Sequence, residues 1–234
     1  MTTASQFSSM SAATGAMPWW YWNRFVLQRL REGVERELLG LDLPEETPLL
    51  EFGCGNKPYA DMATRYGYCY EGADFKDNKH ADIVIDEAGR VDCKDGTYPV
   101  VLSIQVLEHV PDPGAYLREV RRLLSDGGRL VLSTHGMWEY HPCPTDYWRW
   151  TLDGLEKLLI DNGFKVESKQ GIVGLMAASV QLFQDSVRRR LPRGFRQVFV
   201  FLCQGIMSLL DRMQGTNSKN RNSMIYLLVA SVER

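Results

Sequence analysis

Three features that often reveal the class of a protein are missing from this sequence. The five cysteines are scattered and form no CxxC pair. This pattern excludes a disulfide framework and the usual zinc spacing, and it indicates free thiols in a reducing, cytoplasmic compartment without a metal site. The chain contains no uninterrupted run of about eighteen apolar residues, so we expect no membrane-spanning helix. The formal net charge is −2, which gives no indication of a nucleic-acid partner.

The 234 residues are 44% apolar, which is enough for the core of one large domain. Residues 1–17 are rich in Ser, Thr, Ala and Met, resemble no secretory signal and are predicted to be a disordered tail. We predict a helical cap over 18–45 and a main domain built from 46–173 and 223–234. A helical insertion is expected over 174–222.

Apolar periodicity and glycine stops predict strands that alternate with helices. The expected strands span 47–53, 68–75, 81–86, 98–105, 129–134, 164–173 and 223–233, and the helices span 19–39, 57–67, 115–128 and 152–163. This alternation is typical of an α/β, doubly wound, Rossmann-like sheet that is mostly parallel. Such sheets bind ligands at the carboxyl ends of their strands.

A glycine-containing loop follows the first predicted strand in "LLEFGCGNKPY", where Gly53 and Gly55 allow a ligand to approach the backbone closely. Asp74 ends the next predicted strand, nineteen residues after Gly55. An acid at that position accepts hydrogen bonds from the ribose hydroxyls of a nucleoside. The spacing therefore predicts a cofactor that contains adenosine.

The details of the loop distinguish between two cofactors. A dinucleotide fold requires G-x-G-x-x-G and free amides at a helix N-terminus, whereas here the third glycine is absent and Pro58 lacks an amide proton. Glu51 adds a negative charge near the loop. Lys57 argues against a cofactor without phosphate, since its ammonium group could bind a phosphate. We expect a cationic cofactor without phosphate, namely S-adenosylmethionine, and not NAD.

The successive motifs "LLEFGCG", "GADF", "LSIQVLEHVPDP", "LREVRRLLSDGGRLVLST" and "GLEKLLIDNGF" resemble those of class I S-adenosylmethionine-dependent methyltransferases of the small-molecule, type 11-like group. The similarity runs from about Pro48 to Val173. The resemblance implies a seven-stranded sheet whose last strand is antiparallel. It also implies that the cofactor contacts Glu51, Gly53, Cys54, Gly55, Asp74, Phe75, Asp86, Glu87 and Gln105.

The segment "STHGMWEYHPCPTDYWRWT", residues 133–151, follows the fifth predicted strand and holds two of the four histidines. In the family this loop faces the transferred methyl group, and a hydroxyl acceptor benefits from a base with a pKa near neutral. The candidate catalytic residues are His141, then Asp146 and His135. His109 is expected to cap the cofactor pocket instead. Candidate acceptor-binding residues are Trp138, Tyr140, Tyr147, Trp148 and Arg149.

Alternative roles apply to all of these residues. A loop histidine is more often a structural hydrogen bonder than a catalyst, Asp146 could cap a helix or pair with Arg149, and the aromatic rings could pack within a lid. The expected activity is methyl transfer to a hydroxyl of a small molecule, with a sugar or glycan intermediate as one candidate. The alternatives are an N-methyltransferase, a nicotinamide-dependent oxidoreductase and a non-catalytic scaffold that binds S-adenosylmethionine.

The predicted insertion contains helices over 175–191 and 195–213. The second helix gathers apolar residues on one face, and five arginines lie near the junction (Arg188, Arg189, Arg190, Arg193 and Arg196). This face is expected to pack on the sheet, on the N-terminal helix or on a second copy of the chain. The alternative is peripheral contact with an anionic membrane surface.

Overall fold

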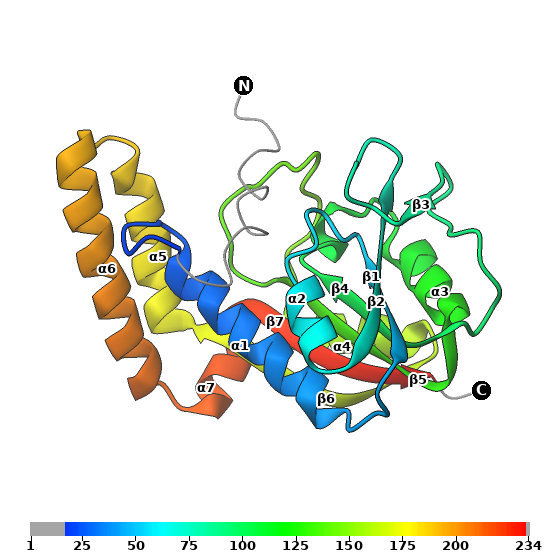
Figure 1. Ribbon diagram of the computed structural model, residues 1–234. Coiled ribbons are helices and arrows are strands. Elements are labelled where there is room, and N and C mark those ends of the chain that lie inside the picture. Colours follow the sequence, from blue (N-terminus) through cyan, green and yellow to red (C-terminus); the bar gives the residue numbers. More distant parts are fainter. Residues whose placement is uncertain (1–16, 233–234) are drawn as a thin grey trace.

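The computed structural model describes residues 17–232 (Figure 1). Its seven-stranded sheet has the order β3-β2-β1-β4-β5-β7-β6. The strands are β1 (Thr47–Phe52), β2 (Tyr68–Phe75), β3 (Ile83–Ile85), β4 (Tyr98–Ile104), β5 (Leu124–His135), β6 (Phe164–Gly174) and β7 (Ser223–Val232). Strands β1 to β5 pair in parallel, whereas β7 runs antiparallel to both β5 and β6. The predicted fold class is confirmed. Except for Met17, the tail expected over 1–17 lies outside the described residues.

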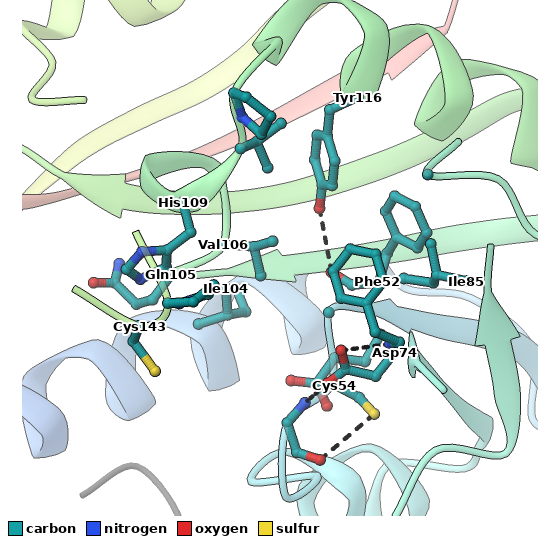
Figure 2. A pocket seen from close by; sticks show the side chains of 18 of the residues that line it. Phe52, Cys54, Asp74, Ile85, Ile104, Gln105, Val106, His109, Tyr116 and Cys143 are labelled. Atoms are coloured by element: carbon teal, nitrogen blue, oxygen red, sulfur yellow. Dashed lines mark hydrogen bonds between the residues drawn. The ribbon is translucent and has the colours of Figure 1, made fainter. Parts of the chain in front are cut away.

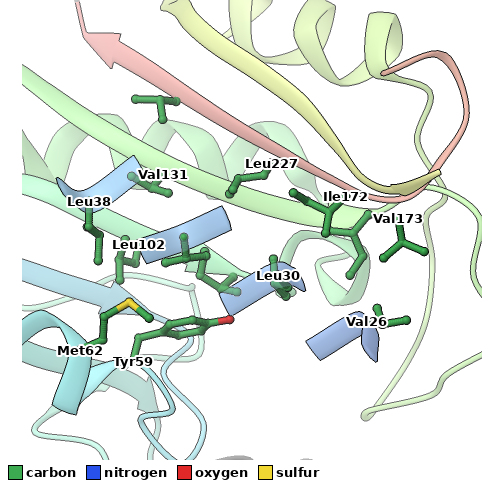
Figure 3. Packing of buried hydrophobic residues seen from close by; sticks show 14 of the residues in the cluster. Val26, Leu30, Leu38, Tyr59, Met62, Leu102, Val131, Ile172, Val173 and Leu227 are labelled. Atoms are coloured by element: carbon green, nitrogen blue, oxygen red, sulfur yellow. The ribbon is translucent and has the colours of Figure 1, made fainter. Parts of the chain in front are cut away.

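Helices cover both faces of this sheet because each buried strand carries apolar side chains on both sides. On one face lie α1 (Arg24–Gly40) and α2 (Ala60–Arg65). Val26, Leu30 and Leu38 line the inner side of α1 and pack against residues such as Leu102 and Leu227 (Figure 3). The four-residue periodicity of the sequence therefore marks a helix that is part of the core.

The opposite face is covered by α3 (Pro113–Leu123) and α4 (Leu152–Asp161). Their N-termini are capped, since the side chains of Asp112 and Thr151 accept hydrogen bonds from backbone amides of the first turn. The helix expected over 115–128 is too long at its C-terminal end, because α3 ends at Leu123. The backbone is already extended at Leu124, where β5 begins and pairs with Tyr98. The first helix likewise begins at Arg24 and not at residue 19.

The connection between β6 and β7 is helical, as predicted, and consists of α5 (Leu175–Arg188), α6 (Arg193–Met213) and the short, unpredicted α7 (Thr216–Arg221). Helices α5 and α6 form a hairpin at one end of the molecule (Figure 1). The apolar face of α6 is largely exposed, and of this face Phe201 is in contact with Trp19. The expectation that the face packs on the sheet or on the N-terminal helix is therefore wrong for most of its residues. Across residues 17–232, no helix combines the length and the apolarity needed to cross a membrane.

Candidate active site

A cavity of about 610 Å³ opens at the carboxyl ends of β1, β2 and β4. Its walls come from the glycine-containing loop after β1, the end of β2, the turn after β3, the short 3₁₀ helix η2 (Leu107–His109) and, in the loop after β5, Cys143, Pro144, Thr145 and Tyr147. A cavity of this size suits a small molecule together with a cofactor. The sheet topology therefore places the predicted binding elements around one space.

The loop after β1 has a conformation that requires glycine. Gly53 has a φ of 89°, and a Cβ atom there would lie 2.7 Å from Cγ2 of Val106. The amides of Gly53 and Cys54 both donate to the carbonyl of Ala73, at 2.9 and 3.0 Å. The amide of Gly55 donates to Asp74. Three successive backbone amides thus already donate hydrogen bonds within the protein. They are not free to bind a pyrophosphate, so the loop forms no anion-binding nest.

Asp74, at the end of β2, is held in a defined orientation beside this loop. Its carboxylate accepts hydrogen bonds from the amides of Gly55 (2.9 Å) and Phe75 (2.8 Å) and from the side chain of Asn78 (2.7 Å). Lys57, which could have met a phosphate, forms an ion pair with Asp82 at 2.5 Å. The position fits an acid that binds ribose hydroxyls, and the neighbouring lysine is already neutralised.

Glu51 lies at the floor of the cavity and is almost fully buried. Burial raises the pKa of its carboxyl to about 8, although a hydrogen bond from the Tyr70 hydroxyl opposes this shift. Burial likewise raises the pKa of the Cys54 thiol to about 12, which leaves no thiolate there at neutral pH. A buried carboxyl of this kind is suited to a cationic ligand, because a nearby positive charge favours its ionised form.

Eight of the nine predicted cofactor residues line this cavity, including Phe75, Glu87 and Gln105. Gln105 has a φ of 59°, and its amide donates to Ser133 on β5 at 2.9 Å. Among the described residues, Asp86 is the predicted member that does not line the cavity. Its carboxylate instead accepts the amides of Ala88 and Arg90 and stabilises the turn after β3.

The loop after β5 is organised by Arg149. Its guanidinium forms a bidentate ion pair with Asp146, at 2.5 and 2.6 Å. It also donates hydrogen bonds to the carbonyls of Trp138 and Glu139. The Asp146 carboxylate also accepts the backbone amide of His141 at 2.7 Å. This pairing holds the pKa of Asp146 below its usual value despite burial. Asp146 and Arg149 therefore shape the loop, and neither lines the cavity.

His135 lies beneath this loop and not at its surface. Its ring is 1% exposed, stacks on Trp138 at 4.6 Å and has Nε2 3.3 Å from a carboxylate oxygen of the buried Glu108. Burial lowers the pKa of His135 well below its usual value. The geometry does not support a direct catalytic role for His135 or for Asp146, because neither can touch a ligand in the cavity.

His109 is the histidine whose side chain lines the cavity (Figure 2). Its Nδ1 lies 2.6 Å from the carbonyl oxygen of Thr145. A carbonyl can only accept, so Nδ1 carries the proton of the neutral ring and Nε2 is left unprotonated. Burial lowers the pKa of His109, which keeps the ring neutral at pH 7. His141 is next to it, with ring centroids 5.8 Å apart, but does not line the cavity.

Of the expected acceptor-binding residues, one lines the cavity and the others do not. Tyr147 lines the cavity together with Cys143, Pro144 and Thr145. Trp148 instead donates from Nε1 to the carbonyl of Val110 at 2.8 Å. Trp138 stacks on His135, and Tyr140 is exposed to solvent. Sequence reasoning missed the wall residues Cys143, Pro144 and Thr145, because nothing in their spacing distinguishes them from neighbouring positions.

Comparisons with known proteins place these observations in a family. A family model described as a methyltransferase domain matches residues 21–169. The chain is 32% identical over 124 residues to a ubiquinone biosynthesis O-methyltransferase of Cereibacter sphaeroides, covering 47% of this chain and 50% of the relative. It is 27% identical over 123 residues to 2-methyl-6-phytyl-1,4-hydroquinone methyltransferase of Synechocystis, covering 47% of this chain and 39% of that protein. The match thus spans half or less of the length of these relatives.

Structural similarity supports the same fold. The chain superposes on phosphoethanolamine N-methyltransferase 2 of Haemonchus contortus, solved with S-adenosyl-L-methionine, with a TM-score of 0.56 and 14% sequence identity. The superposition covers 86% of this chain and 53% of that chain. With the family match over more than half of the chain, the glycine-containing loop and the strand order, these findings show that the chain belongs to the class I methyltransferases that use S-adenosylmethionine.

Proposed function

We propose that the protein transfers a methyl group from S-adenosylmethionine to a hydroxyl of a small molecule, with His109 as the general base. One observation carries this proposal. The cavity holds Cys54 and Asp74 on one side and His109 on the other, with Val106 between them (Figure 2). A cofactor site and a neutral imidazole thus face the same space.

The residues of the first side fit the cofactor. The glycine-containing loop allows close backbone approach, Asp74 offers its carboxylate to the ribose, and Glu51 offers a carboxylate to the methionine end. When bound, S-adenosylmethionine supplies a methyl group that its positively charged sulfur already activates. The protein therefore has to orient the acceptor in line with that methyl group and exclude water.

The residues of the other side can handle the acceptor proton. Nε2 of His109 takes the proton of the acceptor hydroxyl, while the Nδ1 hydrogen bond to Thr145 keeps the ring oriented. The thiol of Cys143 does not compete as a nucleophile, because burial raises its pKa. This arrangement favours a hydroxyl acceptor over an amine, since an amine needs less help from a base.

The walls around His109 favour a hydroxyl on an apolar ring. Val110, Pro111 and Pro144 supply apolar surface there, and of the expected stacking residues Tyr147 lines the cavity. The relatives named for ubiquinone and phytyl-hydroquinone methylation are consistent with such an acceptor. The lining of the cavity is mainly apolar, so we place sugar and glycan hydroxyls second.

Methyl transfer to a panel of phenolic and sugar acceptors tests the proposal. We expect His109→Ala to lower kcat by about 10²–10⁴-fold with the cofactor dissociation constant unchanged. The matched control is His141→Ala, which removes the neighbouring ring from outside the cavity and should leave kcat within a few-fold of the wild type. Near-normal turnover of His109→Ala, or the larger loss in His141→Ala, would refute the assignment of the base.

A further inference from the structure

Helix α6 presents an apolar stripe to solvent. Seven of its side chains, which we call the α6 patch, are between 49% and 75% exposed: Phe195, Val198, Phe201, Leu202, Ile206, Leu209 and Met213. They recur at helical spacing along the whole 21-residue helix. Soluble monomers rarely expose a contiguous apolar patch larger than a few hundred Å². Something other than water is therefore expected to cover the α6 patch.

The opposite face of α6 is buried and combines the apolar Val200, Cys203 and Met207 with polar side chains. Gln184 and Gln204 both donate to the backbone carbonyl of Trp22, at 2.7 and 2.9 Å, and Gln204 accepts the amide of Phe25 at 2.8 Å. Asp211 pairs with Lys219 at 2.9 Å. These specific hydrogen bonds fix the rotation of α6 about its axis. The outward orientation of the apolar stripe is thus determined by the fold.

The charges at the tip of the hairpin select the partner. Residues 186–210 contain five arginines and no aspartate or glutamate. Arg188 and Arg189 pair with Asp185 and Glu139. Arg190, Arg193 and Arg196 are exposed, and within residues 17–232 none of the three lies at ion-pair distance from a carboxylate. An apolar stripe that begins in unneutralised arginines matches a surface with apolar depth and anionic headgroups.

Two tryptophans extend the apolar stripe at its edge. Trp19 packs edge-on against Phe201 with ring centroids 5.1 Å apart, and Trp20 packs edge-on against Trp19 at the same distance. Both indoles are more than two-fifths exposed. Tryptophan is enriched at membrane interfaces because its ring is apolar and its N–H can remain hydrated.

From these observations we infer that the α5–α6 hairpin docks on an anionic lipid surface. The α6 patch and Trp19 enter the interface, and Arg190, Arg193 and Arg196 contact the headgroups. A second copy of this chain fits less well, because the stretch 186–210 offers no carboxylate to neutralise the arginines of a partner.

The docked hairpin would lie beside the active site. The Arg189 guanidinium at the end of α5 pairs with Glu139 at 2.6 Å, and Glu139 belongs to the loop that supplies Cys143 and Tyr147 to the cavity. Figure 1 shows this loop between the hairpin and the sheet. If the proposed function holds, the hydroxyl acceptor is carried in lipid and reaches the cavity from the membrane side.

Vesicle flotation of the full chain tests the inference. We expect the protein to float with vesicles of phosphatidylglycerol mixed with phosphatidylcholine, and less at high salt or with phosphatidylcholine alone. Changing Arg190, Arg193 and Arg196 to glutamine should lower the partition coefficient by roughly fivefold per arginine, on the order of a hundredfold in all. Phe195→Glu with Leu202→Glu should abolish binding, since both side chains are exposed and the fold does not depend on them.

The matched control is Leu39→Glu with Ile160→Glu, which alters side chains about as exposed as Leu202, at 55% and 56%, outside the hairpin. This control should bind vesicles like the wild type. Absence of flotation with any vesicle would overturn the inference. So would a dimer in lipid-free solution that the Phe195→Glu and Leu202→Glu changes dissociate, which would assign the patch to a second copy. Cofactor titration and methyl transfer to a soluble acceptor would remain normal in either case, so the proposed function is tested separately.

Discussion

The pH dependence of cofactor binding should reveal the role of Glu51. Burial raises the pKa of this carboxyl to about 8, so its ionised fraction in the free protein is about 1% at pH 6 and about 9% at pH 7. The amino group and sulfonium of the cofactor favour the ionised carboxyl. If S-adenosylmethionine binds the ionised form alone, its apparent dissociation constant falls about tenfold from pH 6 to pH 7.

Cofactor affinity should rise with pH because the pKa of Glu51 is raised in the free protein. The free protein holds a proton on Glu51, and a cationic ligand lowers the carboxyl pKa, so binding releases close to one proton in this window. The amino group of the cofactor, with a pKa of about 7.7–8.0, stays largely charged between pH 6 and pH 7 and contributes little to the slope.

Isothermal titration calorimetry at pH 6 and pH 7, in buffers of different ionisation enthalpy, measures the dissociation constant and the number of protons released on binding. Glu51→Gln keeps the shape of the side chain and the hydrogen bond from Tyr70 while it removes the titrating group. This variant should bind more weakly than the wild type at pH 7 and show no pH slope. A wild-type dissociation constant that is equal at pH 6 and pH 7, or the same slope in the variant, would refute the reasoning.

Three further changes have defined outcomes. Asp74→Ala should weaken cofactor binding roughly ten- to a hundredfold by calorimetry, because two ribose hydrogen bonds to a charged acceptor are lost; unchanged affinity would mean that the ribose lies elsewhere. Gly53→Ala should lower the free energy of unfolding by about 1–3 kcal/mol in a denaturant titration, since its Cβ would meet Val106 at a positive φ, and an unchanged midpoint would contradict this. Burial raises the pKa of Glu108 to about 7, so the folded state holds an extra proton and unfolding should become easier as pH rises from about 4.5 to 7, by up to about 3 kcal/mol. Glu108→Gln should lose that part of the pH dependence of thermal unfolding, and identical profiles would exclude Glu108 as its source.

The fold could be predicted from the sequence because its main determinants are local. The four-residue period of Val26, Leu30 and Leu38 marks a helix, and strands such as β1, β4 and β7 are mainly apolar runs. The antiparallel direction of β7 came from the family resemblance and not from periodicity. The orientation of α6 could not be predicted, because it depends on long-range hydrogen bonds: Gln204 donates to the carbonyl of Trp22 and accepts the amide of Phe25.

The cofactor side of the cavity was predictable for the same reason. Gly53, Gly55 and Asp74 lie at strand ends, and the carboxyl ends of parallel strands meet at one edge of a sheet. Asp86 also follows a strand, yet its side chain turns back to accept two amides of its own turn. The sequence thus indicates which strand end faces the cavity, but not which of two adjacent side chains, Asp86 or Glu87, points into it.

The acceptor side depends on a loop without periodicity, and Arg149 joins distant parts of this loop. The guanidinium of Arg149 joins Asp146 to the carbonyls of Trp138 and Glu139. This pairing draws Asp146 away from the cavity and brings the carbonyl of Thr145 to Nδ1 of His109. Asp146, a candidate catalytic residue from the sequence, thereby helps to position the Thr145 carbonyl that fixes the tautomer of His109. Glu139 of this loop also forms an ion pair with Arg189 of the hairpin. Contact of the hairpin with a lipid surface would therefore act on the same loop that orients His109.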